Sequence, residues 1–216
     1  GDEILHANHG FEMYSIVSKV VGAVPKKIKE DVNFNLNIEN LIDQTNDATK
    51  VIYIASPNNP TGTYLSRDQL VKLMNSISKN IIVVIDGAYV EYVQKDDYDK
   101  GFSLTDEYEN IILTRTFSKT YGLAALRVGW CYTSQKIADI INKIKPPFNT
   151  TTISQSLAIK ALEDKEHIEN SVKLNSEIKD WFEKELKLLN IKTRQTEGNF
   201  TLIETSEEEA EKISNH

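Results

Sequence analysis

The fold of this chain follows from the stretch NIIVVIDGAY, which runs from Asn80 to Tyr89. Its aliphatic run, Ile81–Ile85, shows no alternation of apolar and polar residues and ends directly at an aspartate. A short continuous apolar run is typical of a strand buried on both faces, as in a parallel sheet covered by helices. The stretch therefore predicts a central strand whose carboxyl end delivers Asp86.

Similar short strands alternate with amphipathic stretches along the chain. The predicted strands are Glu3–His6, Lys50–Ala55, Asn80–Ile85, Asn110–Thr114 and Arg127–Tyr132. The predicted helices are Phe11–Val21, Ser66–Ser78, Ser134–Ile144 and one long helix from about Thr152 to Lys184. Strands that alternate with helices predict an α/β fold with a mostly parallel central sheet flanked by helices.

The chain changes character after Pro146 and Pro147, where the long charged helix is followed by two short predicted strands, Ile191–Arg194 and Phe200–Ile203. We expect a large α/β domain over residues 1–147, and a linking helix with the start of a smaller α+β domain over residues 148–216. The chain lacks an initiator Met and begins at a predicted strand. We therefore expect both domains to be incomplete.

Composition excludes several classes of partner. The 216 residues are 40% hydrophobic, enough for a core, and carry 25 basic and 32 acidic side chains, a net charge of −7. Such a chain repels phosphate backbones and anionic lipids, so we expect neither a nucleic-acid nor a membrane partner. The single cysteine, Cys131, allows no internal disulfide, which fits the cytoplasm. The four histidines show no metal-ligand spacing, so we expect no metal site.

Chemically active residues follow three consecutive predicted strands. The strand ends deliver an amide, then a carboxylate with a phenol, then a cluster of hydroxyls, lysine and arginine. In order, the residues are Asn59, then Asp86 and Tyr89, then Thr116, Ser118, Lys119 and Arg127. Because ligands of open α/β sheets bind at the carboxyl ends of the strands, we expect these side chains to line one pocket.

The third strand end suits a phosphorylated aldehyde. Thr116, Ser118 and Arg127 offer two hydroxyl donors and a planar cation, which match a phosphate dianion. Lys119 is a primary amine, expected to be partly buried beside Arg127, and an amine of this kind attacks a carbonyl carbon.

The other two strand ends suit the ring of such a ligand. Asp86 is a fixed carboxylate that can hold a ring nitrogen protonated, and Asn59 and Tyr89 can hydrogen-bond a phenolate oxygen. Phosphate, aldehyde, pyridinium nitrogen and ring oxygen are the four groups of pyridoxal 5′-phosphate (PLP), which the pattern favours as the cofactor.

Plainer interpretations exist for each residue taken singly. Asp86 after an aliphatic run could bind magnesium, but the Gly-x-x-x-x-Gly-Lys-Ser/Thr loop that accompanies such a site is absent, as is a Gly-x-Gly-x-x-Gly dinucleotide motif. Asn59 could belong to a simple turn, Tyr89 to the core, and Lys119 to the surface. The hypothesis depends on all of them occurring together.

Three segments in this order resemble the PLP-dependent class I and II aminotransferases of fold type I, and among these the histidinol-phosphate aminotransferases most of all. The segments are Ser56–Gly62, Asp86–Tyr92 and Arg115–Trp130. The resemblance implies that Lys119 carries the cofactor covalently and moves a proton on the substrate. It also implies that Phe11 stacks on the cofactor ring. For the other residues it implies the same contacts as the pattern does: with the ring nitrogen, the ring oxygen and the phosphate. The residues are, in that order, Asp86, then Asn59 and Tyr89, then Thr116, Ser118 and Arg127.

The resemblance further implies transamination between L-histidinol phosphate and 2-oxoglutarate, in a homodimer with shared active sites. Two departures are visible: the segment Asn8–Phe11 replaces a motif that usually contains proline, and Gly87 stands where many relatives have Glu. Three alternatives stay open. They are an aromatic or acidic amino-acid aminotransferase, an amino-acid phosphate decarboxylase, and a non-catalytic regulatory module of the same fold.

Overall fold

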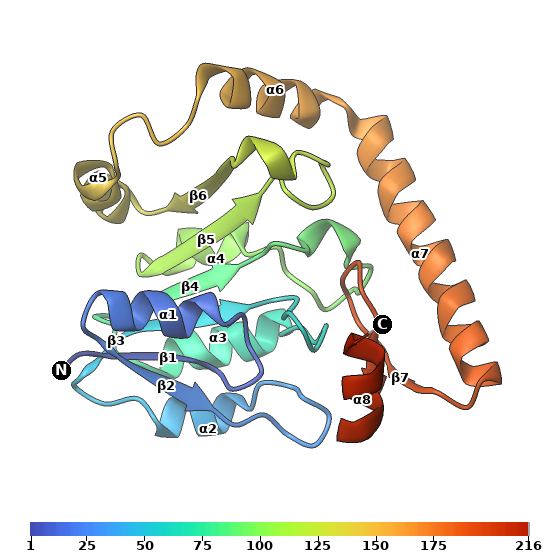
Figure 1. The fold of residues 1–216 in the computed structure, drawn as a ribbon. Coiled ribbons are helices and arrows are strands. Elements are labelled where there is room, and N and C mark those ends of the chain that lie inside the picture. Colours follow the sequence, from blue (N-terminus) through green and yellow to red (C-terminus); the bar gives the residue numbers. More distant parts are fainter. Residues whose placement is uncertain (216) are drawn as a thin grey trace.

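Two separate sheets organise the computed structural model, which describes residues 1–215. The larger sheet has six strands in the order β2-β1-β3-β4-β5-β6 (Figure 1). Its strands are β1 (Glu3–Ala7), β2 (Val24–Ile28), β3 (Thr49–Ala55), β4 (Ile82–Asp86), β5 (Ile111–Thr116) and β6 (Gly129–Thr133). All neighbours from β2 to β5 pair in parallel, and only the edge strand β6 runs antiparallel. The predicted mostly parallel sheet is confirmed.

Helices cover the two faces of this sheet unequally (Figure 1). The connecting helices are α1 (Met13–Val20), α2 (Ile38–Asp43), α3 (Arg67–Ser76) and α4 (Phe102–Glu107). Helix α1 lies on one face and α2, α3 and α4 lie on the other. The reason is that crossover connections are right-handed: the chain moves outward from β1 to β2 and then returns past β1 to β3, so the face changes. The sheet therefore has its topological switch point between β1 and β3, where ligands bind in this type of fold.

Side chains alternate between the two faces of the sheet along each strand, so the hydrophobic core lies on one face and the polar side chains at the strand ends lie on the other. The main hydrophobic core lies on the side of α2 to α4 and includes Ile54 of β3, Ile85 of β4 and Leu113 of β5, all buried. The next residue along β4 and β5, Asp86 and Thr114 respectively, faces the other way, because successive side chains point to opposite faces. Polar side chains thus share the face that α1 covers.

Three elements were not predicted from the sequence. Strand β2 contains Pro25 and two lysines, which weaken its strand pattern, and its place at the sheet edge is where such residues are tolerated. Helices α2 and α4 have six residues each, too few for a helical period to show. The predicted start of α3 is confirmed, because Ser66 and Gln69 form a capping box.

The predicted long helix is wrong in one respect, since the chain forms two helices there: α6 (Thr152–Glu163) and α7 (Lys165–Leu188). They are separated by Asp164, whose ψ of 72° is not helical. The Asp164 carboxylate accepts a hydrogen bond from the backbone N–H of His167 at 3.0 Å. Asp164 is therefore the N-cap of a new helix, a role that favours a break in the first one.

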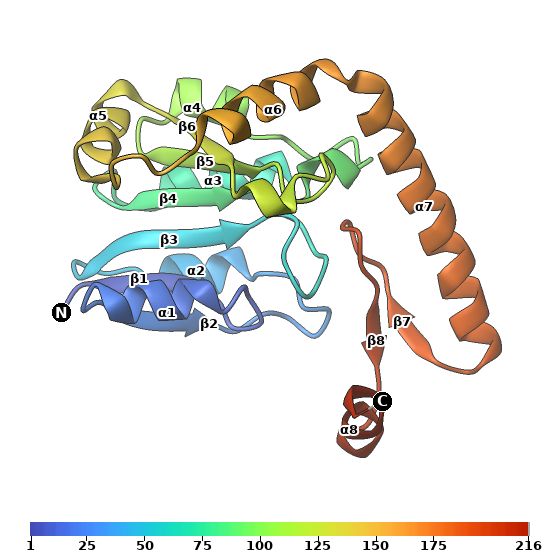
Figure 2. The same ribbon diagram turned by 45° about the horizontal axis from the view of Figure 1, so that its top comes forward.

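The C-terminal part of the chain passes around the outside of the large sheet and returns to it (Figure 2). After α5 (Gln135–Ile144), α6 and α7 come the short strands β7 (Lys192–Arg194) and β8 (Leu202–Glu204), then α8 (Glu207–Ser214). The two predicted strands are thus confirmed within two residues. The division into domains at residue 147 stays a prediction.

The loop between β7 and β8 contacts the large sheet directly. The backbone N–H of Glu197 donates to the carbonyl of Gly62 at 2.8 Å. Gly62 has a φ of +70°, and a Cβ there would lie 2.2 Å from Cβ of Thr196. Only glycine allows both this backbone conformation and this close approach. Among residues 1–215, no helix is both long and apolar enough to cross a membrane.

Candidate functional site

A cavity of about 380 Å³ opens over the carboxyl ends of β3, β4 and β5, beside the start of α1. Every residue that the sequence analysis selected for the site lines this cavity. They are Phe11, Asn59, Asp86, Tyr89, Thr116, Ser118, Lys119 and Arg127. The structure thus brings the selected residues together at the expected edge of the sheet, while their individual roles stay predictions.

Asp86 holds a central place in the cavity because it is the last residue of β4. In the sheet it pairs with Ala55 of β3 on one side and Thr114 of β5 on the other. The hydroxyl of Thr114 donates to Oδ1 of Asp86 at 3.2 Å. The phenol of Tyr14 donates to Oδ2 at 2.7 Å. Each carboxylate oxygen therefore has a protein donor from a neighbouring element.

Tyr14 is the one cavity residue with a polar side chain that the sequence analysis did not select among residues 1–215. A tyrosine on a predicted amphipathic helix is usually a core residue, so nothing in its own pattern separated it from the core. Its ring is stacked on Tyr53 of β3, with centroids 4.6 Å apart and planes 5° apart. Phe11 meets Tyr14 edge to face at 5.8 Å and is 46% exposed at the cavity. The one signal in the sequence was its position three residues after Phe11, because residues three apart lie on the same face of a helix.

Asn59 and Tyr89 lie together in the cavity wall. The amide of Asn59 donates to the phenolic oxygen of Tyr89 at 3.3 Å, and Tyr89 is only 5% exposed. Behind it, Phe200 packs edge to face at 5.2 Å, so the β7–β8 loop supports this wall. The ammonium of Lys119 lies 5.3 Å from the centre of the Tyr89 ring. Lys119 is exposed in this chain, which corrects the expectation of partial burial.

Thr116, Ser118 and Arg127 form one polar cluster. The backbone N–H of Ser118 donates to the Thr116 hydroxyl at 3.0 Å, and Nη1 of Arg127 donates to the Ser118 hydroxyl at 3.3 Å and the Ala124 carbonyl at 2.8 Å. Arg127 was expected in a strand. It instead follows a single 3₁₀ turn, Ala124–Leu126, in the left-handed region with φ of 48°, and β6 begins only at Gly129. That turn directs the guanidinium back toward Ser118.

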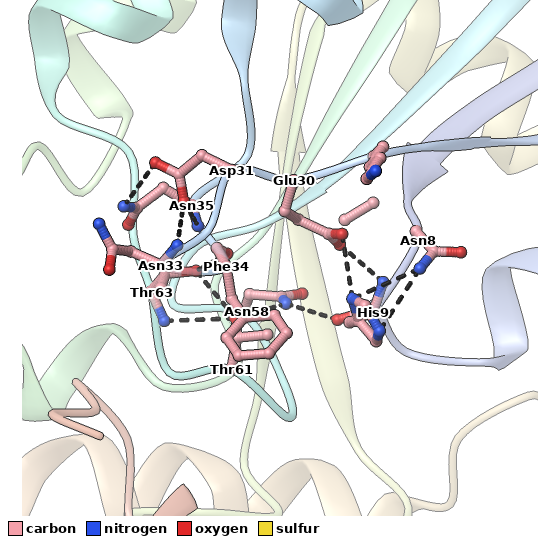
Figure 3. A network of polar contacts seen from close by, with 12 residues as sticks. Asn8, His9, Glu30, Asp31, Asn33, Phe34, Asn35, Asn58, Thr61 and Thr63 are labelled. Carbon is pink, nitrogen blue, oxygen red and sulfur yellow. Dashed lines mark hydrogen bonds and ion pairs between the residues drawn. The ribbon is translucent and has the colours of Figure 1, made fainter. Parts of the chain in front are cut away.

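A polar network ties together the loops that follow β1, β2 and β3 (Figure 3). Glu30, with a side chain only 3% exposed, accepts from the backbone N–H of His9 at 2.6 Å and contacts its Nδ1 at 3.0 Å. The amide of Asn58 donates to the carbonyl of His9 at 2.8 Å. His9 lies two residues before Phe11 and Asn58 directly before Asn59. The network therefore holds two segments that line the cavity.

Glu30→Ala should lower the free energy of unfolding by about 2–3 kcal/mol, because it leaves the N–H of His9 without its charged acceptor. Urea unfolding followed by circular dichroism measures the change. Glu39→Ala is the matched control: its carboxylate pairs with Lys72 on the surface and is 65% exposed, so we expect a loss below about 1 kcal/mol. Equal losses in the two variants would contradict the role given to Glu30.

The departure at Gly87 has a structural cause. A Cβ at this position would lie 2.3 Å from Nη1 of Arg115 and 2.5 Å from Cγ1 of Val90. Arg115 is buried; Nη1 donates to the carbonyl of Thr114 at 2.7 Å, and its guanidinium lies 5.7 Å from the ring centre of Phe102. The arginine thus occupies the space that a larger residue next to Asp86 would need.

Gly87→Ala should destabilise the protein by about 1–3 kcal/mol through overpacking. Gly87 does not have a positive φ, so backbone strain does not contribute. The midpoint of urea unfolding measures the loss. The same substitution made together with Arg115→Met should cost less, because the guanidinium is gone, and an identical cost in both backgrounds would refute this explanation.

Residues 1–215 contain no group of three or more His, Cys, Asp or Glu side chains arranged to hold a metal ion.

Comparison with known proteins gives a consistent result. The family model described as aminotransferase class I and II matches residues 1–215. The chain is 40% identical over 205 residues to the histidinol-phosphate aminotransferase of Zymomonas mobilis, covering 94% of this chain and 55% of that protein.

Solved structures agree in fold. Histidinol-phosphate aminotransferase from Sinorhizobium meliloti, in complex with pyridoxal-5′-phosphate, superposes with a TM-score of 0.87 at 23% identity, covering 93% of this chain and 54% of that one. Aspartate aminotransferase from Thermotoga maritima superposes with a TM-score of 0.90 at 25% identity, covering 100% of this chain and 60% of that one.

The chain spans about half the length of the curated relatives it matches. Within that span, the match to the family model is continuous, and the cavity gathers all three segments that carry the resemblance. This chain belongs to the class I and II aminotransferase family.

Proposed function

We propose that this chain forms most of the cofactor site of a PLP-dependent aminotransferase that exchanges an amino group between L-histidinol phosphate and 2-oxoglutarate, a step of histidine biosynthesis. The observation that carries the proposal is the single cavity in which a lysine, a fixed carboxylate, an amide–phenol pair and a hydroxyl–guanidinium cluster meet.

The donor set fits the cofactor group by group. Thr116, Ser118 and Arg127 offer hydroxyls and a cation for the phosphate, at the end of the cavity formed by the loop after β5. Asp86 offers a carboxylate for the ring nitrogen. Lys119 offers the amine that an aldehyde requires. Asn59 and Tyr89 offer hydrogen bonds for the ring oxygen, so each of the four groups has a suitable side chain at the cavity.

When bound, PLP supplies a protonated ring that takes up the electron pair left as the substrate Cα–H bond breaks. Lys119 would anchor the cofactor and then, with its Nζ free, take the proton from the substrate Cα. Asp86 would keep the ring nitrogen protonated through its negative charge. Asn59 and Tyr89 would orient the ring by hydrogen bonds to its oxygen, and Phe11 would cover one ring face.

The choice of substrate is supported by the 40% identity to a protein named histidinol-phosphate aminotransferase. The structural likeness to an aspartate aminotransferase makes an acidic amino donor the rival to exclude. A homodimer with shared sites and a cytoplasmic location stay predictions that follow from the family resemblance.

The test uses the full-length gene product that contains this chain. The protein is incubated with PLP, reduced with borohydride and digested with trypsin. A label on Lys119 blocks cleavage there, so the mass of the cofactor should appear on the peptide Thr116–Arg127. In a separate sample that is neither reduced nor digested, glutamate production from 2-oxoglutarate is compared for L-histidinol phosphate, aspartate, tyrosine and phenylalanine. A label elsewhere would refute the cofactor site, and a preference for another donor would refute the substrate.

A further inference from the structure

We infer that Tyr14 is a positioning residue for the proposed reaction: its phenol holds the Asp86 carboxylate in the orientation that pairs with the cofactor ring nitrogen. The inference rests on the proposed function and assigns a role to a residue outside the set that the sequence pattern selected.

The Asp86 carboxylate needs such a partner. Rotation about the bond to a carboxylate is broad, so the backbone of β4 alone does not set the plane of the two oxygens. The two hydrogen bonds do: Tyr14 donates to Oδ2 at 2.7 Å and Thr114 donates to Oδ1 at 3.2 Å. The shorter bond comes from Tyr14, on a helix that packs against the same face of the sheet.

Tyr14 is itself held rigidly. It is 6% exposed, lies parallel to Tyr53 and is nearly perpendicular to the ring of Phe11. Its helix is fastened to β1 by a buried contact of 3.0 Å between Ser15 Oγ and Nε2 of His6. A donor ordered before the ligand arrives loses no further freedom on binding, which is the basis of preorganisation.

The phenol also keeps its proton. Burial, with the neighbouring Asp86 charge adding to it, raises the pKa of Tyr14 well above its ordinary value. Tyr14 therefore keeps its proton at neutral pH and acts as the donor to Asp86.

The test separates a role at the ring nitrogen from a general structural role. Two probes are titrated into the full-length protein: PLP and its analogue with carbon in place of the ring nitrogen. Tyr14→Phe removes only the hydroxyl and keeps the ring packed on Tyr53. We expect its affinity for PLP to fall about tenfold, as for a lost hydrogen bond to a charged group, with the affinity for the carbon analogue unchanged.

A matched control and a second variant complete the design. Tyr64→Phe removes a tyrosine–carboxylate bond of similar length, 2.8 Å to Asp97, away from the cavity, so neither affinity should change. Thr114→Val removes the other donor to Asp86 and should reproduce the selective loss more weakly. This second variant keeps the inference testable should Tyr14→Phe fold poorly.

Each result decides the matter. A selective loss for PLP supports the inference. An equal loss for both probes, or no loss in either variant, overturns it while leaving the Lys119 label intact. Absence of the label from the unmodified protein overturns the proposed function, and the inference with it.

Discussion

Replacing Lys119 with alanine should abolish amino transfer, lowering the turnover number by about 10⁴-fold or more, since one amine is lost as both covalent anchor and proton carrier. Lys119 is the only lysine that lines the cavity within the described residues. Its Nζ is free of any ion pair there and rests over the ring of Tyr89. Stopped assays of glutamate formation with the purified full-length variant measure the loss.

Two further variants identify the cause of that loss. Lys119→Arg keeps the positive charge but lacks the nucleophilic amine, so it should be as inactive as Lys119→Ala. Lys79→Ala removes an exposed lysine just before β4 and should leave turnover unchanged. Turnover near normal in Lys119→Ala, or restored turnover in Lys119→Arg, would end the proposal for this residue.

Asp86→Ala should lower turnover by about 10²–10³-fold, as for the loss of one preorganised group that stabilises the charge developing in a transition state. The carboxylate lies between Tyr14 and Thr114, which aim it into the cavity. Without it the ring nitrogen would lose the negative charge that keeps it protonated. Cofactor binding should weaken but persist, because the phosphate cluster and Lys119 are untouched.

Asp86→Asn tests whether turnover depends on the negative charge of the side chain or only on its shape. The amide nearly keeps the volume of the side chain, but it has one acceptor oxygen in place of two, so only one of the bonds from Tyr14 and Thr114 is kept as it is. We expect a loss of stability in urea of about 1 kcal/mol, while turnover falls almost as far as in Asp86→Ala. Asp97→Ala, which loses a tyrosine–carboxylate bond outside the cavity, should keep full turnover. Full activity in Asp86→Asn would show that the negative charge is not needed.

Much of the large sheet could be predicted because its signals are local. The run Ile81–Ile85 and its successor Asp86 are neighbours in the chain, and the capping box at Ser66 lies within four residues. Elements whose stability comes from their place in the fold escaped prediction. Strand β2 depends on pairing with β1 at the sheet edge, and the break at Asp164 depends on a cap that a continuous helical pattern hides.

The sequence by itself determined which chemical groups stand at the strand ends, because each follows its own strand and parallel strands align their carboxyl ends at one edge of the sheet. Only the tertiary structure decided how those groups are held. Tyr14 and Asp86 are 72 positions apart in the sequence. They meet because the connection from β1 to β2 places α1 on one face of the sheet, and the alternation of side chains along β4 directs Asp86 to that same face. The same holds for Gly87, whose missing side chain is explained by Arg115, a residue 28 positions further on that reaches it from the neighbouring strand β5.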